Sequence, residues 1–191
     1  MSRGKTYDMV YIAVFAVVMA ICSWISIPAT VPFTLQTFGV FLAVGVLGGK
    51  RGTLSILVYI LLGAVGVPVF AGFSGGIGSL FGNAGGYIIG FPGGCSGYVG
   101  HGKSNGKKTC ALAVQMVVGL IVCYAFGTAW FMIMYTRSAG PVGLVTVLGW
   151  CVFPFIIPDL IKIVVALGLT KSLKKYFLLC SSHRISRRRD L

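Results

Sequence analysis

Long apolar runs separated by short polar or glycine-rich gaps form the main pattern of this sequence. A run of about 20 apolar residues is long enough to cross the hydrocarbon core of a bilayer as a helix. The pattern predicts an all-α membrane protein with six transmembrane helices. They form one domain over residues 1–191, with a lead (1–8), a bundle (9–176) and a basic tail (177–191). The expected spans are Met9–Ile27, Phe38–Gly48, Thr53–Val67, Ser79–Val99, Thr109–Met134 and Ile156–Tyr176.

The gaps between the runs differ in character. Val142–Phe153 is apolar, but Pro154 and Pro158 interrupt the residues after it, and proline breaks or kinks a helix. We interpret this stretch as an interfacial or re-entrant piece, or as the first part of a bent helix. The other gaps are expected to be loops or turns: Pro28–Thr37, Gly49–Gly52, Pro68–Gly78, Gly100–Lys108 and Tyr135–Pro141.

Composition and charge support the membrane assignment. The chain is 57% hydrophobic and only 10% charged, against about 25% charged residues in a soluble domain. Its net charge of +13 is concentrated in the lead, the 49–52 turn, the 100–108 loop and the tail, whereas the alternate gaps hold only Arg137. The positive-inside rule therefore places both termini in the cytoplasm of a cell that carries this protein in its plasma membrane. Nothing resembles an aromatic and basic surface for nucleic acid.

Several kinds of chemistry are not expected. The six cysteines form no CxxC pair and are interpreted as small buried hydrophobes. Gly97–Ser104 matches the phosphate-loop pattern GxxxxGK[ST], but a membrane helix precedes it and it lacks an acidic residue for magnesium. His101 and His183 lie in basic segments, and the chain has no glutamate. We therefore expect no enzyme activity, no metal and no cofactor.

One short stretch, Pro158–Lys162, is exceptional. The chain has only three acidic residues, and Asp159 alone lies inside a strongly apolar run. Lys162 follows three residues later, so both side chains share one helix face. A charge at the centre of a membrane helix is unfavourable by about 2.5–3.5 kcal/mol. The two groups are therefore either paired with each other or offered to a ligand.

A ligand site near these charges would draw on the fourth span. Asn83 offers a donor and an acceptor, Tyr87 lies one turn further along, and Gly86 begins a glycine stripe that permits close approach of a helix or a ligand. Asp159 would accept from N–H groups and Lys162 would hold a carboxylate. Aromatic residues of the uncharged loops would cover an apolar ligand body: Trp24, Phe33, Phe70 and Phe73.

The first span carries a second pattern. Small residues recur at Ala13, Ala16, Ala20 and Ser23, with a spacing of three and four. Such a stripe lets another helix approach closely. It indicates either helix contacts within the bundle or an interface with a partner subunit.

The sequence resembles the BioY family, the biotin-binding S component of energy-coupling factor (ECF) transporters. The motifs that carry the resemblance are Val31–Thr37, Leu47–Gly52, Gly66–Phe70, Gly85–Phe91 and Pro158–Lys162. It implies a six-helix fold that binds biotin near the outer surface through Asp159 and Lys162, with the loop after the first span as a lid. It also implies docking, through small residues such as Ala16 and Ala20, onto a membrane coupling protein driven by two ABC-type ATPases.

The sequence departs from the family at Gly82–Ala84, where the family commonly has Gly-Pro-Thr. The function expected is capture of biotin for uptake into the cell. The alternative is a stand-alone secondary carrier or channel for a small carboxylate-bearing solute, with Asp159 as a proton site. The sequence leaves open whether the chain acts alone, as a homo-oligomer or with shared partner subunits.

Overall fold

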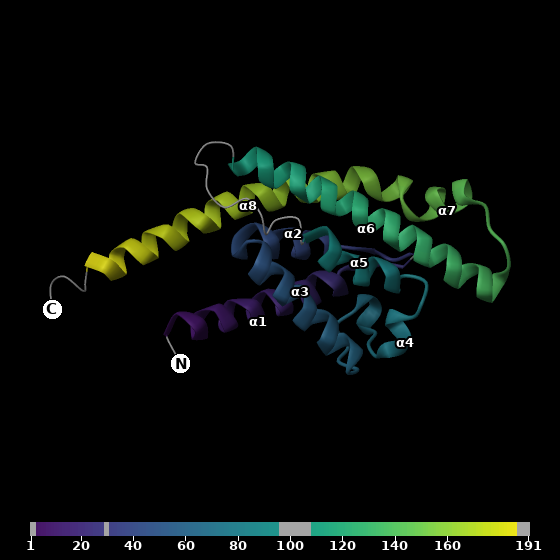
Figure 1. Cartoon of the computed structure of the whole chain (residues 1–191), viewed down its shortest axis with the longest axis horizontal. Helices are drawn as coiled ribbons and strands as arrows, with labels where there is room; N and C mark the ends of the chain where they lie inside the picture. Colours follow the sequence, from purple (N-terminus) through teal and green to yellow (C-terminus); the bar gives the residue numbers. More distant parts are fainter. Residues whose placement is uncertain (1–2, 29–30, 96–107, 187–191) are drawn as a thin grey trace.

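The structure, a computed structural model, describes residues 3–28, 31–95 and 108–186 (Figure 1). This part of the chain is mostly helical. Its α-helices are α1 (Arg3–Trp24), α2 (Gln36–Leu47), α3 (Gly49–Ala64), α4 (Ile77–Leu80), α5 (Gly85–Cys95), α6 (Lys108–Ala139), α7 (Leu144–Cys151) and α8 (Phe153–Ser186). A short 3-10 helix, η1 (Ala71–Phe73), precedes α4.

Among the described residues, three helical segments are long and apolar enough to cross a membrane. They are Thr6–Trp24, Cys110–Ala139 and Leu144–Lys174, the last of which joins α7 and α8. The protein is therefore a multi-pass membrane protein with a helical fold. The 12-residue helix α2 is only about 18 Å long at 1.5 Å per residue, short of the ~30 Å hydrocarbon core.

Two predicted boundaries in the first half are wrong. The chain turns at Gly48, whose φ of 81° favours glycine, so Lys50 and Arg51 belong to the first turn of α3 rather than to a separate turn. The predicted span Ser79–Val99 is broken between α4 and α5, and α5 begins only at Gly85. Residues 96–99 of that prediction lie outside the described residues, as does most of the predicted 100–108 loop.

The second half is more helical than predicted. Helix α6 continues through Tyr135 to Ala139, where a turn was expected. The stretch before the last span, whose structure the sequence left open, forms the separate helix α7, which ends at Cys151. Pro154 lies in the first turn of α8. The backbone N–H groups of this turn have no partner within the helix, so proline, which lacks an N–H, costs no hydrogen bond there. Helix α8 extends to Ser186, so most of the predicted tail continues this helix.

The helices form a bundle with distinct ends. Helix α5 packs on α6, α1 packs on α2 and α3, and α2 packs on α8. The start of α1 and the end of α8 lie at the same end of the bundle, while the connection from α6 to α7 lies at the other (Figure 1). Among the described residues the strands are β1 (Ser26–Ile27) and β2 (Phe33–Thr34), which form an antiparallel hairpin between α1 and α2.

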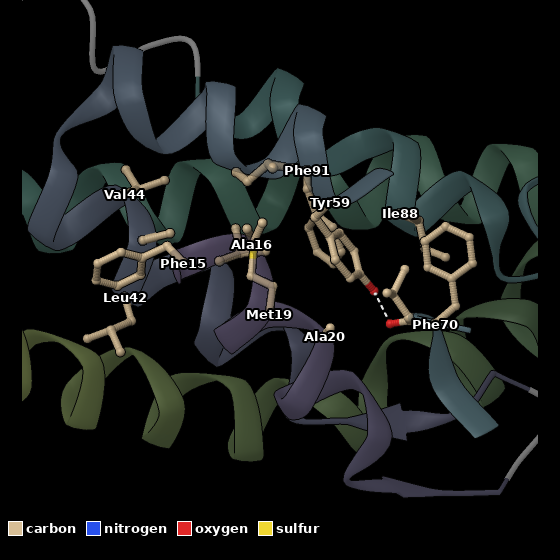
Figure 2. Close-up of a cluster of buried hydrophobic side chains, with 14 of the residues drawn as sticks. Phe15, Ala16, Met19, Ala20, Leu42, Val44, Tyr59, Phe70, Ile88 and Phe91 are labelled. Carbon is tan, nitrogen blue, oxygen red and sulfur yellow. Dashed lines mark hydrogen bonds between the residues drawn. The ribbon is translucent and has the colours of Figure 1, made fainter. Parts of the chain in front are cut away.

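The main core lies between α1, α2, α3 and α5 (Figure 2). Two of its polar side chains are bonded internally: the hydroxyls of Ser23 and Tyr59 both donate to the carbonyl oxygen of Val69, at 2.7 and 3.0 Å. Ala16 and Ala20 are buried in this core, at 2% and 5% exposure. At these two positions the stripe therefore contributes to contacts within the bundle, and docking of a partner through them stays a prediction. Ala13 is exposed.

Candidate ligand-binding site

Asp159 and Lys162 form an ion pair near the start of α8. The Lys162 Nζ lies 2.7 Å from Asp159 Oδ1, and the side chains of Lys162 and Asp159 are 7% and 2% exposed, respectively. The i and i+3 positions place both groups on the helix face that packs on α2. The sequence therefore identified the pair correctly, and the two charges neutralise each other.

The ammonium group of Lys162 has no donor left over. Besides Asp159, it donates to the carbonyl oxygen of Thr34 at 2.7 Å and to Thr37 Oγ1 at 3.1 Å. A lysine carries three N–H donors, so all of them are used. The ammonium also lies 4.3 Å from the centre of the Phe33 ring. Lys162 thus ties the hairpin and the start of α2 to α8.

The carboxylate of Asp159 is held from three elements. Oδ1 accepts from Lys162 and, at 3.0 Å, from the Thr37 hydroxyl on α2. Oδ2 accepts a 2.6 Å hydrogen bond from the Tyr124 hydroxyl on α6. Isolated charges are strongly disfavoured in a protein interior, and bonds of this kind are what keep such a pair tolerable. The network fixes the direction of the carboxylate before any ligand arrives.

This polar network forms part of the wall of a cavity between the hairpin, α2, α5, α6 and α8. The hairpin contributes Pro32 and Thr34 to the wall, and α5 contributes Tyr87, Ile88 and Phe91. The other apolar residues of the wall are Val31, Ala71, Ala84, Cys123, Cys151 and Phe155. The other polar residues are Gln36, Thr37, Tyr124, Asp159 and Lys162. The site suits a largely apolar molecule with one polar end.

A second cavity, of about 440 Å³, adjoins the first. It lies between α2, α5 and α6 and shares Thr37, Phe91 and Cys123 with the first cavity. Apart from Thr37 and Gln115, its lining is apolar.

The three residues that were predicted in the fourth span differ in their relation to the cavity. Tyr87 lines the cavity, with its hydroxyl 3.3 Å from Thr128 Oγ1. Gly86 does not line it: the glycine faces α6, where an added Cβ would overlap the Trp130 side chain. The glycine thus serves the close approach of a helix, one of its two predicted uses. Asn83 lies in the turn before α5, one residue from the lining residue Ala84.

The aromatic cover also differs from the prediction. Phe70 is 1% exposed in the core, where its ring meets that of Tyr59. Trp24 and Phe73 stack on each other at the surface, with ring centres 5.0 Å apart. Phe33 covers Lys162 and contacts Phe155. The rings that line the cavity are instead those of Tyr87, Phe91, Tyr124 and Phe155.

Sequence reasoning missed four polar residues of the wall: Thr34, Gln36, Thr37 and Tyr124. Gln36 and Thr37 lie in a motif that carries the family resemblance, but their role was not predicted. Tyr124 is one aromatic among many in an apolar run, and only the fold brings it to Asp159. The available signal was polarity: Gln36 and Gln115 are the only glutamines in the chain.

The fold and site define a helical membrane protein with a mostly apolar cavity beside a buried ion pair. A model of the BioY family matches residues 1–178. The chain belongs to the BioY family.

Named relatives agree with this assignment. "Biotin transporter BioY" of Thermotoga maritima is 41% identical over 171 residues, which cover 88% of this chain and 96% of the relative. "Probable biotin transporter BioY" of Pyrococcus horikoshii is 40% identical over 171 residues, which cover 89% and 98%. Because the relatives are transporters, family membership confirms the expectation of a transport protein rather than an enzyme.

A solved structure agrees as well. The crystal structure of the S-component for biotin from an ECF-type ABC transporter matches with a TM-score of 0.75 and 25% identity. The match covers 92% of this chain and 94% of that chain. The helical bundle of this protein is therefore the fold of an ECF S-component.

Proposed function

We propose that this chain is the substrate-specific component of a biotin uptake system. The observation that carries the proposal is the buried Asp159–Lys162 pair in the wall of a mostly apolar cavity. Relatives that cover almost the whole chain are named as biotin transporters. The cavity gives biotin an apolar surround for its ring sulfur and valeryl chain, and a carboxylate for a ureido N–H group.

The spacing of the two charges refines their roles. Asp159 Oδ1 and Lys162 Nζ are 2.7 Å apart, whereas a chain of methylenes separates the carboxylate of biotin from its ureido ring. A fixed pair therefore meets one end of the ligand. We assign Asp159 to a ureido N–H group, and we assign Lys162 to holding Asp159 and the hairpin in place. This assignment replaces our expectation that Lys162 holds the ligand carboxylate.

The ligand itself tests that revision. Biotinamide keeps the ureido ring but has no carboxylate. The proposal expects Lys162→Ala to weaken the binding of biotin and biotinamide by the same factor. A loss of affinity for biotin but not for biotinamide would show that Lys162 binds the carboxylate of the ligand. Asn83 stays a predicted ligand residue, since it lies beside the lining residue Ala84.

The proposed topology has six spans and cytoplasmic termini. Arg51 on α3 forms a 2.7 Å ion pair with Asp8 in α1, so the basic start of α3 lies beside the first part of α1. The start of α1 and the end of α8 lie at the same end of the bundle (Figure 1), and basic residues favour the cytoplasmic side. Helix α1 exposes Val10, Val14 and Val17, as expected of a surface that meets lipid or another membrane protein. The hairpin, by covering the cavity from the opposite side, would serve as its lid.

Transport requires partners in this proposal. A membrane coupling protein and two ABC-type ATPases would supply the energy, and the solved S-component comes from such a system. Of the small residues predicted to dock the coupling protein, Ala13 remains on the exposed face of α1. The chain itself would bind ligand without nucleotide.

Titration of the purified chain with biotin, thiamine and riboflavin, without nucleotide, tests the ligand assignment. Selective binding of biotin is expected. Reconstitution in vesicles separates transport by partners from the alternative, a stand-alone carrier with Asp159 as a proton site. Uptake that needs the ATPases and ignores the proton gradient supports the proposal. Uptake by the chain alone, driven by the gradient, supports the carrier.

A further inference from the structure

The proposed function gives no role to Gln36, a polar residue of the cavity wall. It is the first residue of α2, lines the cavity and is only 5% exposed. Its backbone N–H is bonded to Thr34 Oγ1 at 3.3 Å. Its side-chain amide nitrogen, however, is fully buried and has no hydrogen-bond partner among the described residues.

An unpaired buried donor is unusual, because proteins satisfy nearly all such groups. Two threonine hydroxyls, those of Thr53 and Thr170, share this state, but neither lines the cavity. Gln36 is thus the one of the three residues that lines the proposed site. The arrangement is expected if the missing partner is the ligand.

The rest of the network shows what that partner must be. Lys162 has used its three donors, and the Tyr124 hydroxyl donates to Asp159. A carboxylate has about four acceptor positions, and Thr37, Lys162 and Tyr124 occupy those of Asp159 except one on Oδ2. The wall therefore offers a carboxylate acceptor and an amide donor. A cyclic urea, with N–H beside C=O, complements both.

We propose that the Gln36 carboxamide donates a hydrogen bond to the ureido oxygen of biotin while Asp159 accepts from a ureido N–H. This inference rests on the proposed function and makes Gln36 a specificity-determining residue. It predicts discrimination against 2-iminobiotin, the analogue in which a guanidinium replaces the urea near neutral pH. The guanidinium carries N–H groups where the urea has its acceptor oxygen.

Two substitutions test the proposal by calorimetric titration. Gln36→Met keeps the length of the side chain and removes its donor, and should weaken biotin binding about 10-fold, the effect of one hydrogen bond. Gln36→Glu replaces the donor with an acceptor and should shift the preference by at least about 10-fold from biotin towards 2-iminobiotin. Gln115→Met, in the wall of the adjoining cavity, is the matched control and should change neither affinity.

Thermal unfolding without ligand separates this role from a structural one. Because Gln36→Met removes an unpaired buried donor, the ligand-free variant should melt at or above the wild-type temperature, and its biotin-induced stabilisation should be smaller. Equal biotin affinity in wild type and Gln36→Met, or an unchanged analogue preference in Gln36→Glu, would overturn the assignment of Gln36 alone. A wild-type chain that binds no biotin would instead overturn the proposed function. If Gln36→Met does not fold, the Gln36→Glu preference decides the question.

Discussion

The hydroxyl of Tyr124 on α6 donates a 2.6 Å hydrogen bond to Asp159 Oδ2 on α8. Lys162 approaches the other oxygen of the same carboxylate at 2.7 Å. These two bonds hold the Asp159 side chain in one rotamer between α6 and α8. A site that is ordered before the ligand binds loses less entropy on binding.

Tyr124→Phe removes this bond and leaves the ring in place. We expect biotin affinity to fall about 10-fold, because a hydrogen bond to a charged group contributes roughly 1.5–3 kcal/mol and part of that loss reaches the ligand through Asp159. Calorimetric titration measures it. Tyr135→Phe, near the end of the same helix and outside the cavity wall, is the control and should bind as wild type.

The ion pair can be separated into its structural and ligand-binding roles. Asp159→Asn leaves the buried Lys162 ammonium without its counter-charge, which should destabilise the ligand-free chain by about 3–5 kcal/mol. The double variant Asp159→Asn/Lys162→Met removes both charges and should recover much of that stability. Thermal unfolding in detergent measures both changes.

Biotin binding should not recover with stability. The double variant lacks the carboxylate that accepts from a ureido N–H group, so we expect an affinity at least about 100-fold below wild type, a difference of about 2.7 kcal/mol. If the folded double variant binds biotin as tightly as wild type, the pair is structural and Asp159 is not a ligand residue.

Gly127 on α6 provides space for the Tyr87 ring. A Cβ at this position would overlap the ring, so Gly127→Val should push Tyr87 towards the cavity and lower biotin affinity at least about 10-fold. Gly168→Ala on α8 is the control, since its Cβ would meet no atom within 4 Å. Binding by Gly127→Val at the wild-type affinity would show that the Tyr87 ring does not border the bound ligand.

The two faces of α1 give opposite predictions. Ala13 is exposed, and Ala16 is 2% exposed in the core. Ala13→Trp should leave biotin binding intact but reduce uptake in vesicles that contain the coupling protein and ATPases. Ala16→Trp should overpack the core and lower the melting temperature. Val118→Trp, on an exposed face of α6, controls for a bulky residue in lipid. Unchanged uptake by Ala13→Trp would remove Ala13 from the docking surface.

The ion pair was predictable from the sequence because charge is rare in this chain. Asp159 and Lys162 stand out against an apolar run, and their spacing fixes a shared helix face. The helix positions were largely predictable for a similar reason, since long apolar runs have few alternatives. The break at Val152 and the continuation of α6 to Ala139 depend on local geometry that hydropathy does not encode.

Other parts of the site depend on contacts between distant residues. Thr37 and Tyr124 reach Asp159 across 122 and 35 positions of the chain. The orientation of the alanine stripe was also undetermined, because both faces of a membrane helix are apolar, so hydrophobicity does not separate inside from outside. Small residues at Ala16 and Ala20 fit a core and an interface equally well.

The most direct test is calorimetric titration of the purified wild-type chain with biotin and with biotin methylated on both ureido nitrogens. If Asp159 accepts from a ureido N–H group, biotin binds without nucleotide and the methylated ligand binds at least about 10-fold more weakly. Absence of biotin binding at micromolar protein, or equal affinity for the two ligands, would contradict the account.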